Sequence, residues 1–561
     1  MNTFTAHTDA VGGSLALSAA VATLPLIVFF IMLLGFKVRA HVAGAASLLT
    51  ALLVATLGFN MPWDLAGMSA VRGGLYGAFP IVWVILMAIW FYQITVLSGR
   101  FEDLRRTFDA IGGGDLRIQA ILIAFCFGGL LEALAGFGAP VAITATMILA
   151  LGVKPLKAAI TVLLANTAPV AFGAVAIPIT TAGEVGGKSS EAIGAIVGHQ
   201  APFLAFFVPL ILLFILDGMK GVKDAWVPAS VIGFSFAIAQ WFTATYFAYQ
   251  LTDVVACIFA LGVAVAFLRV WKPRGVAEVR ERYNLPPIDA NEKSELTGMR
   301  VWMALMPYLV VVIIFGLANL ATGIVNWLKS TTATFHMPLL HERLVDGAGK
   351  AVKSDYAFPW LNNPGTFLLI SGIIVAIVYM VFNENGRYSL NGGAVVREIG
   401  NTAYRMRFSA LTIVLVLALA YVMNFSGQTV AMGEFVSGLG PIYALLAPTL
   451  GWIGTAVTGS DTSANALFSK MQVAAADHLA HQGVTGVTPE LLLAANTTGG
   501  VVGKMISPQS LAIAATAVDM EGKESDIFKA VLPWSVIFLV AVCILVFLQT
   551  NVLHFMIAGF N

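Results

Sequence analysis

Long apolar runs separated by short polar stretches dominate the chain, and this pattern predicts membrane-spanning helices. A run of about 20 apolar residues is the length that an α-helix needs to cross the hydrocarbon core of a bilayer. The strands of a membrane β-barrel are shorter and alternate between polar and apolar residues, which these runs do not. We therefore expect an all-α polytopic membrane protein with about 12 to 16 membrane segments. The predicted segments are 14–36, 41–58, 75–97, 118–135, 138–153, 155–182, 192–216, 225–245, 250–270, 300–322, 364–383, 408–426, 436–453, 455–476, 490–516 and 530–550.

Four of these stretches carry glycine, proline and polar residues inside an apolar run, which predicts broken or re-entrant helices. They are EALAGFGAP (132–140), NTAP (166–169) with the residues that follow it, TGSDTSANA (458–466) and NTTGG (496–500) with its continuation to 510. A broken backbone is tolerated in a membrane only where protein or a water-filled cavity satisfies the freed polar groups. A tightly packed kinked helix is the alternative interpretation. The residues expected at the breaks are Gly136, Gly138, Pro140, Pro169, Gly459 and Gly500.

The positively charged residues indicate how the segments thread through the membrane. They lie at 37–39, 100–117, 154–157, 220–223, 269–300, 387–407 and 523–529. Alternate threading of the segments places all of these groups on one side, which the positive-inside rule assigns to the cytoplasm. Both termini are then outside, and 323–363 is a long external loop that is either an ordered cap or a floppy connection. The first apolar run is too long for a cleaved signal peptide and no Lys or Arg precedes it, so we expect a spanning helix there.

The sequence also repeats itself. LLANTAPVAFG (163–173) matches LAANTTGGVVG (493–503) at an offset of about 330 residues, and Ser98-Gly99 recurs as Ser426-Gly427 at nearly the same offset. The threading runs the two halves in opposite directions, so we expect two inverted-topology repeats. Such repeats with broken helices are typical of secondary transporters, whose binding site lies near the midplane. The expected organisation is a first membrane repeat (14–216), a helix pair between the repeats (225–270), a cytoplasmic linker (271–299) and a second membrane repeat (300–550).

Composition excludes several other classes of protein. Hydrophobic residues make up 58% of the 561 residues and charged residues only 11%, whereas soluble proteins carry roughly 25% charged residues. A net charge of +1 provides no basic surface for nucleic acid. The three cysteines lie in separate apolar runs, so neither a disulfide framework nor a zinc-binding pair is expected. Because no HExxH, GxSxG or paired Cys/His pattern occurs, we expect no enzyme activity, no metal and no cofactor.

The polar residues at the breaks predict a binding site for a small anion. Glycine-rich turns that begin a half-helix expose backbone N–H groups and the positive end of the helix dipole. Lys504 is either a counter-charge for the anion or a partner for Asp461. GGVVGK is not a phosphate-binding loop, because Met505 stands where that motif needs Ser or Thr. The candidate substrate-binding residues are Asn166, Thr167, Ser460, Thr462, Asn496, Thr497, Thr498, Gly499, Lys504 and Ser507.

Two carboxylates at corresponding breaks, Asp461 and Glu132, are the candidates for carrying a proton. An ionisable group at membrane depth costs roughly 2.5–3.5 kcal/mol on insertion scales, so such groups are usually functional. Asp461 is also expected to lie where a new helix begins. His199 more often donates to a backbone carbonyl than acts in transport, and Lys470 is interpreted as a residue that extends its amine to the membrane surface.

At these motifs the chain resembles the bacterial L-lactate permease family, which includes glycolate permeases. The matching strings are FCFGGLLEALAGFGAPVAITA (125–145), NTAPVAFGA (166–174), GSDTSANALF (459–468), AANTTGGVVGKMISPQS (494–510), SFAIAQ (235–240) and GKESD (522–526). The resemblance spans essentially the whole chain, apart from 271–299 and 323–363. It implies import of L-lactate, often with D-lactate and glycolate, by proton symport across the bacterial inner membrane.

The implied substrate agrees with the physics of the membrane. A 2-hydroxy-monocarboxylate is an anion at neutral pH, and moving it inward against the potential costs about 2.3 kcal/mol per charge per 100 mV. A proton that accompanies it removes this cost, so the expected partners are a small monocarboxylate, protons and the lipid bilayer. Two alternatives stay open: a sodium-coupled carboxylate transporter, since Ser, Thr and Asn at broken helices also suit Na⁺, and an anion channel.

Overall fold

The structure is a computed structural model that describes residues 3–111, 114–134, 139–283, 297–345, 351–557 and 559. In the first part of the chain the helices are α1 Leu15–Ala22, α2 Leu24–Phe30, α3 Ala40–Leu53, α4 Trp63–Tyr76, α5 Trp83–Leu97, α6 Arg100–Ile111, α7 Leu116–Ile121, α8 Gly128–Leu134, α9 Ala139–Ala150, α10 Pro155–Ala165, α11 Gly173–Gly186 and α12 Ser190–Tyr246. They continue with α13 Thr252–Val270, α14 Val276–Arg282, α15 Gly298–Leu320, α16 Thr322–Ser330, α17 Pro364–Val381, α18 Gly392–Ser426, α19 Gln428–Ser437, α20 Tyr443–Thr458, α21 Asp461–His481, α22 Pro489–Gly503, α23 Pro508–Ala517 and α24 Glu524–Gln549. Four short strands are β1 Phe4–Thr5, β2 Ala333–Phe335, β3 Leu344–Val345 and β4 Tyr356–Phe358.

The all-α membrane architecture is confirmed. Within the described residues, 11 helices are long and apolar enough to cross a membrane, or 12 when the bent pair α10 and α11 counts as one span. The count of 11 is just below the predicted range of 12 to 16, and the count of 12 is its lower limit. α12 is a single run of 57 residues, about 85 Å long if it were straight, but Gly218 and Ala225 interrupt its helical backbone. It therefore comprises two passes, as the predicted segments 192–216 and 225–245 require.

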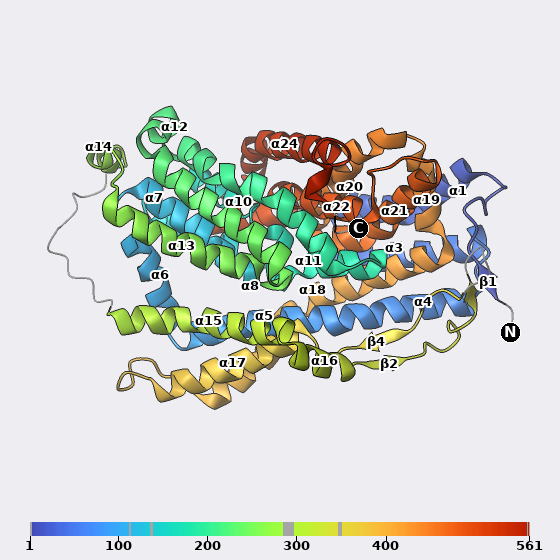
Figure 1. The fold of residues 1–561 in the computed structure, drawn as a ribbon, viewed down its shortest axis with the longest axis horizontal. Coiled ribbons are helices and arrows are strands. Elements are labelled where there is room, and N and C mark those ends of the chain that lie inside the picture. The colour runs from blue at the N-terminus through green and yellow to red at the C-terminus, as the bar shows by residue number, and fades with distance from the viewer. Residues whose placement is uncertain are drawn as a thin grey trace.

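Two long helical segments run side by side through the middle of the molecule (Figure 1). One is Trp63–Leu97, which contains α4 and α5, and the other is α18; each has 35 residues. They pack backbone against backbone where α4 has glycine, since a Cβ at Gly73 would lie only 2.8 Å from the Cα of Ala418. Both begin earlier than the predicted segments 75–97 and 408–426. The predicted boundaries were wrong because arginines inside these helices interrupt the apolar runs from which the segments were predicted.

α6, α7 and α14, which carry several of the positive charges, lie together at one end of the molecule (Figure 1). Arg117 forms ion pairs with Asp217 at 3.3 Å and with Asp224 at 3.5 Å. Arg300 pairs with Glu384 at 3.1 Å. These contacts join loops that the charge pattern predicted to be on one side of the membrane. The assignment of that side to the cytoplasm stays a prediction.

The opposite end carries a cap built from the region 322–363 and the N-terminal segment. β2 and β4 form an antiparallel pair, and β1 pairs in parallel with β3. Arg343 of the cap forms an ion pair of 2.6 Å with Asp64 at the beginning of α4. The region was predicted to be either an ordered cap or a floppy connection. Its described residues form an ordered cap.

Elements at the repeat offset share their form. α10 and α22 begin with Pro155 and Pro489, and each is followed by a 3₁₀ turn and a further helix. The two segments of 35 residues also end at the paired Ser-Gly positions. These similarities agree with a duplication, and the inverted relation between the halves stays a prediction.

Candidate functional site

A cavity of about 60 Å³ lies where the broken helices meet. At roughly 10–15 Å³ for each water molecule, this is room for about four to six waters, which suits a small organic acid. The walls come from α8, α11, the junction of α20 with α21, and α23. The lining residues are Glu132, Val170, Gly173, Ala174, Pro178, Gly459, Ser460, Asp461, Thr462, Lys504, Gln509, Ser510 and Ile513.

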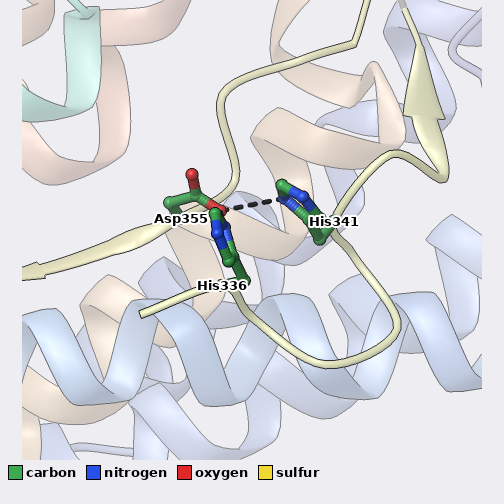
Figure 2. Close-up of side chains that lie close together, drawn as sticks. All are labelled: His336, His341 and Asp355. Atoms are coloured by element: carbon green, nitrogen blue, oxygen red, sulfur yellow. Dashed lines mark hydrogen bonds and ion pairs between the residues drawn. The ribbon is translucent and has the colours of Figure 1, made fainter. Parts of the chain in front are cut away.

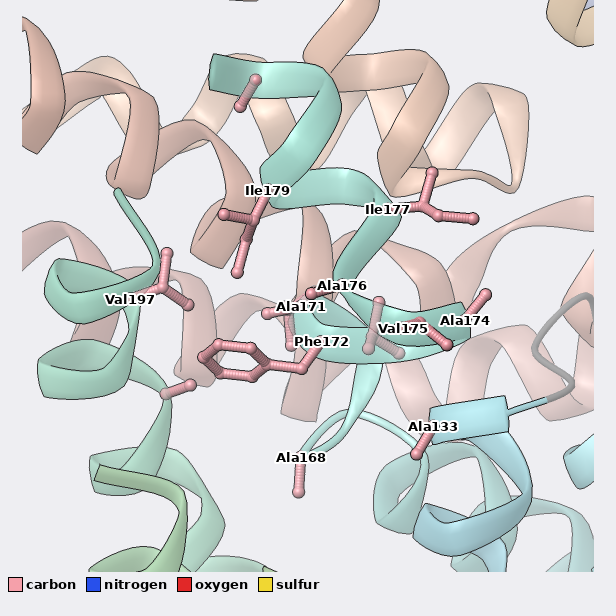
Figure 3. Packing of buried hydrophobic residues seen from close by; sticks show 14 of the residues in the cluster. Ala133, Ala168, Ala171, Phe172, Ala174, Val175, Ala176, Ile177, Ile179 and Val197 are labelled. Atoms are coloured by element: carbon pink, nitrogen blue, oxygen red, sulfur yellow. The ribbon is translucent and has the colours of Figure 1, made fainter. Parts of the chain in front are cut away.

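The break between α10 and α11 forms one wall. The two helices are bent by 58° about a 3₁₀ turn, Val170–Phe172. Ala174, Val175 and Ala176 then adopt left-handed φ angles of 44°, 61° and 56°, a conformation that costs roughly 1–2 kcal/mol per residue. Figure 3 shows buried apolar side chains around this turn, with Phe172 and Ile179 on the side of Val197 in α12. Apolar packing therefore holds a strained backbone beside the cavity.

Gln240 of α12 satisfies a backbone group that this break frees. Its Nε2 donates to the carbonyl oxygen of Ala168 at 3.1 Å and to Asp253 Oδ1 at 2.9 Å. Freed carbonyls inside a membrane protein need such partners, because no bulk water reaches them. Asp253 and Gln240 were not among the predicted site residues, although both lie in predicted membrane segments, where a carboxylate and an amide are unusual.

The junction of α20 with α21 forms the opposite wall. Gly459 ends α20 in a left-handed conformation with φ 76°, and Ser460 caps α21 by accepting from Ser463 N at 3.3 Å. α21 begins at Asp461, as predicted. Ser460, Asp461 and Thr462 all line the cavity. The positive end of a helix of 21 residues is thus directed at it.

Lys504 and Glu132 form a buried ion pair across the cavity. Lys504 Nζ donates to Glu132 Oε1 at 2.5 Å, and Asn166 Nδ2 donates to Oε2 at 3.0 Å. Only 3% of Glu132 and 8% of Lys504 are exposed. Lys504 was predicted to be either a counter-charge for the anion or a partner for Asp461. In the structure the ion pair of Lys504 is with Glu132 and not with Asp461.

Asp461 is a buried carboxylate whose partners are incomplete. Its Oδ1 lies 3.5 Å from Thr455 Oγ1, and its Oδ2 has no hydrogen-bond partner among the described residues. A buried charged oxygen without a partner is costly, so this group favours binding a proton or another cation. Gly500 makes room for it, because a Cβ there would overlap Oδ1 and lie 2.8 Å from Cγ. The prediction of a helix break at Gly500 was wrong, since this residue lies inside α22, which continues to Gly503.

The other polar residues of α22 bind neighbouring helices and do not line the cavity. Asn496 Nδ2 and Thr497 Oγ1 donate to Asn465 Oδ1 at 2.9 and 3.1 Å. Thr498 donates to Gln200 Oε1 at 2.7 Å. Gly499 lies against the carbonyl group of Pro448. Their role as substrate ligands therefore has no support from this arrangement.

The remaining predicted residues lie at the edge of the site or outside it. Thr167 donates to the Leu164 carbonyl oxygen, Ser507 donates to Ser510, and neither lines the cavity. Pro169 lies in the break after α10, and Pro140 lies in the first turn of α9. Gly136 and Gly138 fall outside the described residues.

His199 has the structural role expected for a lone histidine in a membrane helix. Its Nδ1 lies 2.7 Å from the Ala195 carbonyl oxygen, and its Nε2 accepts from Trp241 Nε1 at 2.9 Å. It does not line the cavity described above.

A second and larger cavity, of about 760 Å³, lies between the cap and the bundle; we name it the vestibule. It is lined by residues of α4, α11, α18, α21, the N-terminal segment and the cap. Its charged lining residues are Arg72, Glu184, Lys188, Lys353 and Lys470, so positive charge prevails. The small cavity and the vestibule lie along the same two helices. On α11, Pro178 lines the small cavity and Glu184 lines the vestibule; on α21, Asp461 and Lys470 do the same. Nine residues of helix separate the two sites on α21, a distance of about 13 Å.

Arg72 is the most deeply buried of the charged vestibule residues that were not predicted from sequence. It is 5% exposed, its Nη2 lies 3.3 Å from Glu184 Oε1, and its Nε donates to the Asp355 carbonyl oxygen at 3.0 Å. Its Nη1 has no hydrogen-bond partner in the described part of the chain. The Tyr421 ring lies 4.8 Å from the guanidinium carbon. Arg72 lies just before the predicted segment 75–97, so a segment that began earlier in the chain would have included an arginine inside an apolar helix.

A polytopic α-helical protein whose broken helices enclose a buried charged cavity belongs to the class of membrane transporters. Comparison with known proteins identifies the family. The L-lactate permease family matches residues 18–553, and the chain belongs to this family.

Two relatives resemble the chain over almost its full length. The glycolate permease GlcA of Escherichia coli strain K12 is 38% identical, covering 96% of this chain and 97% of its own. The L-lactate permease of Bacillus subtilis strain 168 is 36% identical over 98% of each chain. Among solved structures, the YdaH transporter of Alcanivorax borkumensis aligns with 80% of this chain and 87% of its own at 15% identity, with a TM-score of 0.32, which is too low to indicate the same fold.

Proposed function

We propose that this protein is a secondary active transporter that imports L-lactate, together with D-lactate and glycolate, by proton symport. The observation that carries the proposal is the set of buried charges around the small cavity: the Glu132–Lys504 ion pair and the incompletely partnered Asp461. The names of the relatives support the substrate class, because they include both a glycolate and an L-lactate permease. The bacterial inner membrane is the proposed location, with both termini outside.

Charge balance explains why an anion would travel with a proton. With both carboxylates ionised, Glu132, Asp461 and Lys504 carry a net negative charge in a site with few exposed atoms. A carboxylate that enters this site adds a further negative charge, which a low-dielectric environment opposes strongly. A proton on Asp461 or Glu132 offsets it. A proton on Glu132 would also weaken its hold on Lys504, so that the amine becomes available to the substrate.

The two cavities suggest a path and a binding pose. A carboxylate in the positively charged vestibule would first meet Arg72. Its Nη1 has no partner within the described residues and is a donor of the right kind for an oxyanion. In the small cavity, Lys504 and the beginning of α21 would bind the carboxylate. The hydroxyl groups of Ser460 and Thr462 would bind the 2-hydroxyl of the substrate.

The proposal is tested in proteoliposomes that contain the purified protein. We expect a pH gradient, acidic outside, to drive accumulation of labelled L-lactate in sodium-free buffer. We expect Asp461→Asn to abolish this accumulation while it retains exchange of labelled for unlabelled lactate. Asp477→Asn is the matched control, since Asp477 lies on the same helix and is exposed; it should behave as wild type.

The same measurements decide between the alternatives. Asp461 Oδ2, which has no partner in the described part of the chain, would also suit Na⁺. A requirement for a sodium gradient would replace proton symport by sodium symport. A channel would show no acceleration of labelled uptake by unlabelled lactate inside the vesicles. Full gradient-driven uptake by Asp461→Asn would remove this residue from the coupling role.

A further inference from the structure

Three potential metal ligands converge in the cap (Figure 2), and none of them lines the small cavity. They are His336, His341 and Asp355, and their nearest ligand atoms all lie within 4.8 Å of one another. Asp355 Oδ1 lies 3.0 Å from His336 Nδ1 and 3.1 Å from His341 Nδ1. Figure 2 shows both imidazole rings next to the Asp355 carboxylate, and the two ring centroids lie 4.0 Å apart. The three groups thus share one small space rather than forming separate pairs.

The local fold brings these residues together. β2 and β4 pair in antiparallel register, with Phe335 opposite Tyr356. His336 follows the last residue of β2, and Asp355 precedes the first residue of β4, so the two leave the same end of the strand pair. The chain then turns back so that His341 reaches the same point.

Buried residues anchor that turn. Met337 is 4% exposed and Leu340 is fully buried, and His341 N donates to the Met337 carbonyl oxygen at 3.1 Å. The side chains of His336 and His341 are 67% and 42% exposed, so an ion from solvent reaches them. An ordered backbone with accessible ligand atoms is the arrangement that metal capture requires.

We propose that His336, His341 and Asp355 form a binding site for a divalent transition-metal ion, of which Zn²⁺ fits best. Imidazole nitrogen together with carboxylate oxygen is a donor set for zinc, whereas Ca²⁺ and Mg²⁺ select oxygen ligands. Zinc bonds of about 2.0–2.1 Å in tetrahedral geometry place the ligand atoms about 3.3 Å from each other. The two distances from Asp355 are close to this value, and a small shift of the histidine rings completes it.

The proposed coordination leaves one position for water. Each histidine binds through the lone pair of Nδ1, and any proton on that nitrogen moves to Nε2 or to solvent. Glu342 Oε1 lies 3.9 Å from His341 Nε2, which is too long for a hydrogen bond, so this exposed side chain would have to move closer to orient the bound ring. The carbonyl oxygen of Asp355 accepts from Arg72, so the metal site and the vestibule share one backbone segment.

No metal was expected from the sequence, because the chain lacks paired cysteines and has no histidines in an HExxH pattern. This set has neither feature. The spacing of His336, His341 and Asp355 along the sequence indicates a shared site only once the pairing of β2 with β4 is known.

The test is a titration of Zn²⁺ alone into the full-length, tag-free protein in detergent, monitored by isothermal calorimetry. We expect saturable binding that weakens at least tenfold in each of His341→Ala and Asp355→Asn. His481→Ala is the matched control, because His481 is an exposed histidine at the end of α21 and should leave this binding unchanged. Ca²⁺ at the same concentrations should not compete.

A second measurement keeps the proposal testable if a variant misfolds. X-ray absorption of the zinc-loaded wild-type protein should show two imidazole ligands with oxygen in the remaining positions. Absence of zinc binding by the wild type, a spectrum without imidazole, or affinity unchanged in well-folded Asp355→Asn protein would each overturn the assignment. Loss of binding in the His481→Ala control alone would assign the ion to α21 and overturn it as well.

Discussion

Lys504 and Glu132 meet as a buried ion pair of 2.5 Å, although one follows α22 and the other belongs to α8. The pair joins the two halves of the chain at the small cavity. Removing one partner of a buried pair leaves the other charge uncompensated, which usually costs about 3–5 kcal/mol. Replacing both partners costs much less. The pair therefore predicts strong coupling between substitutions at these two positions.

We expect Glu132→Gln and Lys504→Met each to lower the free energy of unfolding by about 3–5 kcal/mol. The double variant should lose clearly less than the sum of the single losses. Thermal unfolding of the four proteins in the same detergent measures this coupling as a double-mutant cycle. Additive losses would show that the two side chains do not interact in the native protein.

Local chemistry made the beginning of α21 predictable from sequence. A glycine followed by capping residues is a signal that depends on only a few residues. The break at Gly459 and the start of a helix at Asp461 lie as expected, although the side chain that caps the helix is Ser460 and not Asp461. The partner of Lys504 was not predictable in the same way. Whether Lys504 pairs with Glu132 or with Asp461 depends on how helices that are distant in sequence pack together, and local sequence patterns do not predict that packing.

The mistaken break at Gly500 has a different cause. Glycine and threonine interrupt helices, but they also allow close packing of helices within a membrane. Sequence alone does not separate these two uses. The structure shows close packing at Gly500, with Asp461 in the space that a side chain would fill.

That packing predicts the effect of adding one methyl group to α22. Gly500→Ala would press a Cβ against the carboxylate of Asp461, and overpacking of this kind typically costs about 1–3 kcal/mol. We also expect gradient-driven uptake to fall sharply, because the carboxylate must move. Gly262→Ala in α13 is the control, since a Cβ there meets nothing within 4 Å. Equal stability and uptake in both variants would contradict the close approach of Gly500 and Asp461.

The left-handed turn after α10 predicts an unusual response to glycine. Ala174 has φ 44°, so Ala174→Gly relieves about 1–2 kcal/mol of backbone strain and loses only one methyl group. We expect the variant to be at least as stable as wild type. Ala182 lies in the regular part of the same helix, so Ala182→Gly should lower the free energy of unfolding by about 1 kcal/mol. Thermal unfolding compares them, and equal destabilisation of both would mean that Ala174 is not strained.

An ion-pair cluster outside the membrane segments predicts a dependence of stability on pH. Burial tends to raise the pKa of Glu384, but hydrogen bonds and charges from Arg300 and Arg100 outweigh it, so the pKa lies below its ordinary value. A lowered pKa in the folded state means that the stabilisation is complete above the ordinary value of about 4.5. It is lost as the pH falls through the pKa of the folded protein.

We therefore expect Glu384→Gln to unfold at a lower temperature than wild type at pH 7. The difference should begin to shrink as the pH falls below about 4.5 and should disappear below the lowered pKa of the folded protein, where the wild-type carboxylate becomes protonated as well. Thermal unfolding from pH 7 to about pH 3 in one detergent measures it. Glu434→Gln, at a half-buried residue of α19, is the control and should show no comparable trend. A difference that stays constant with pH would show that the charge of Glu384 is not what stabilises this cluster.

Arg72 predicts how substrate is captured in the vestibule, if the proposed function holds. Its Nη1 is buried and has no partner among the described residues, so a carboxylate bound there would gain a charge-assisted hydrogen bond worth about 1.5–3 kcal/mol. We expect Arg72→Gln to raise the KM for lactate uptake at least about tenfold. Arg72→Lys should restore only part of the affinity, since lysine lacks the planar fork of donors.

Lys353→Gln separates this local contact from a general effect of positive charge. Lys353 lines the same vestibule but is exposed, so water and salt screen its charge and we expect KM to change less than about twofold. Both variants should elute as monodisperse protein, which excludes misfolding as the cause. A similar rise in KM for both would mean that the vestibule acts only through its summed charge. An unchanged KM in Arg72→Gln, with wild-type uptake intact, would remove Arg72 from the substrate path and leave the proposed transport function standing.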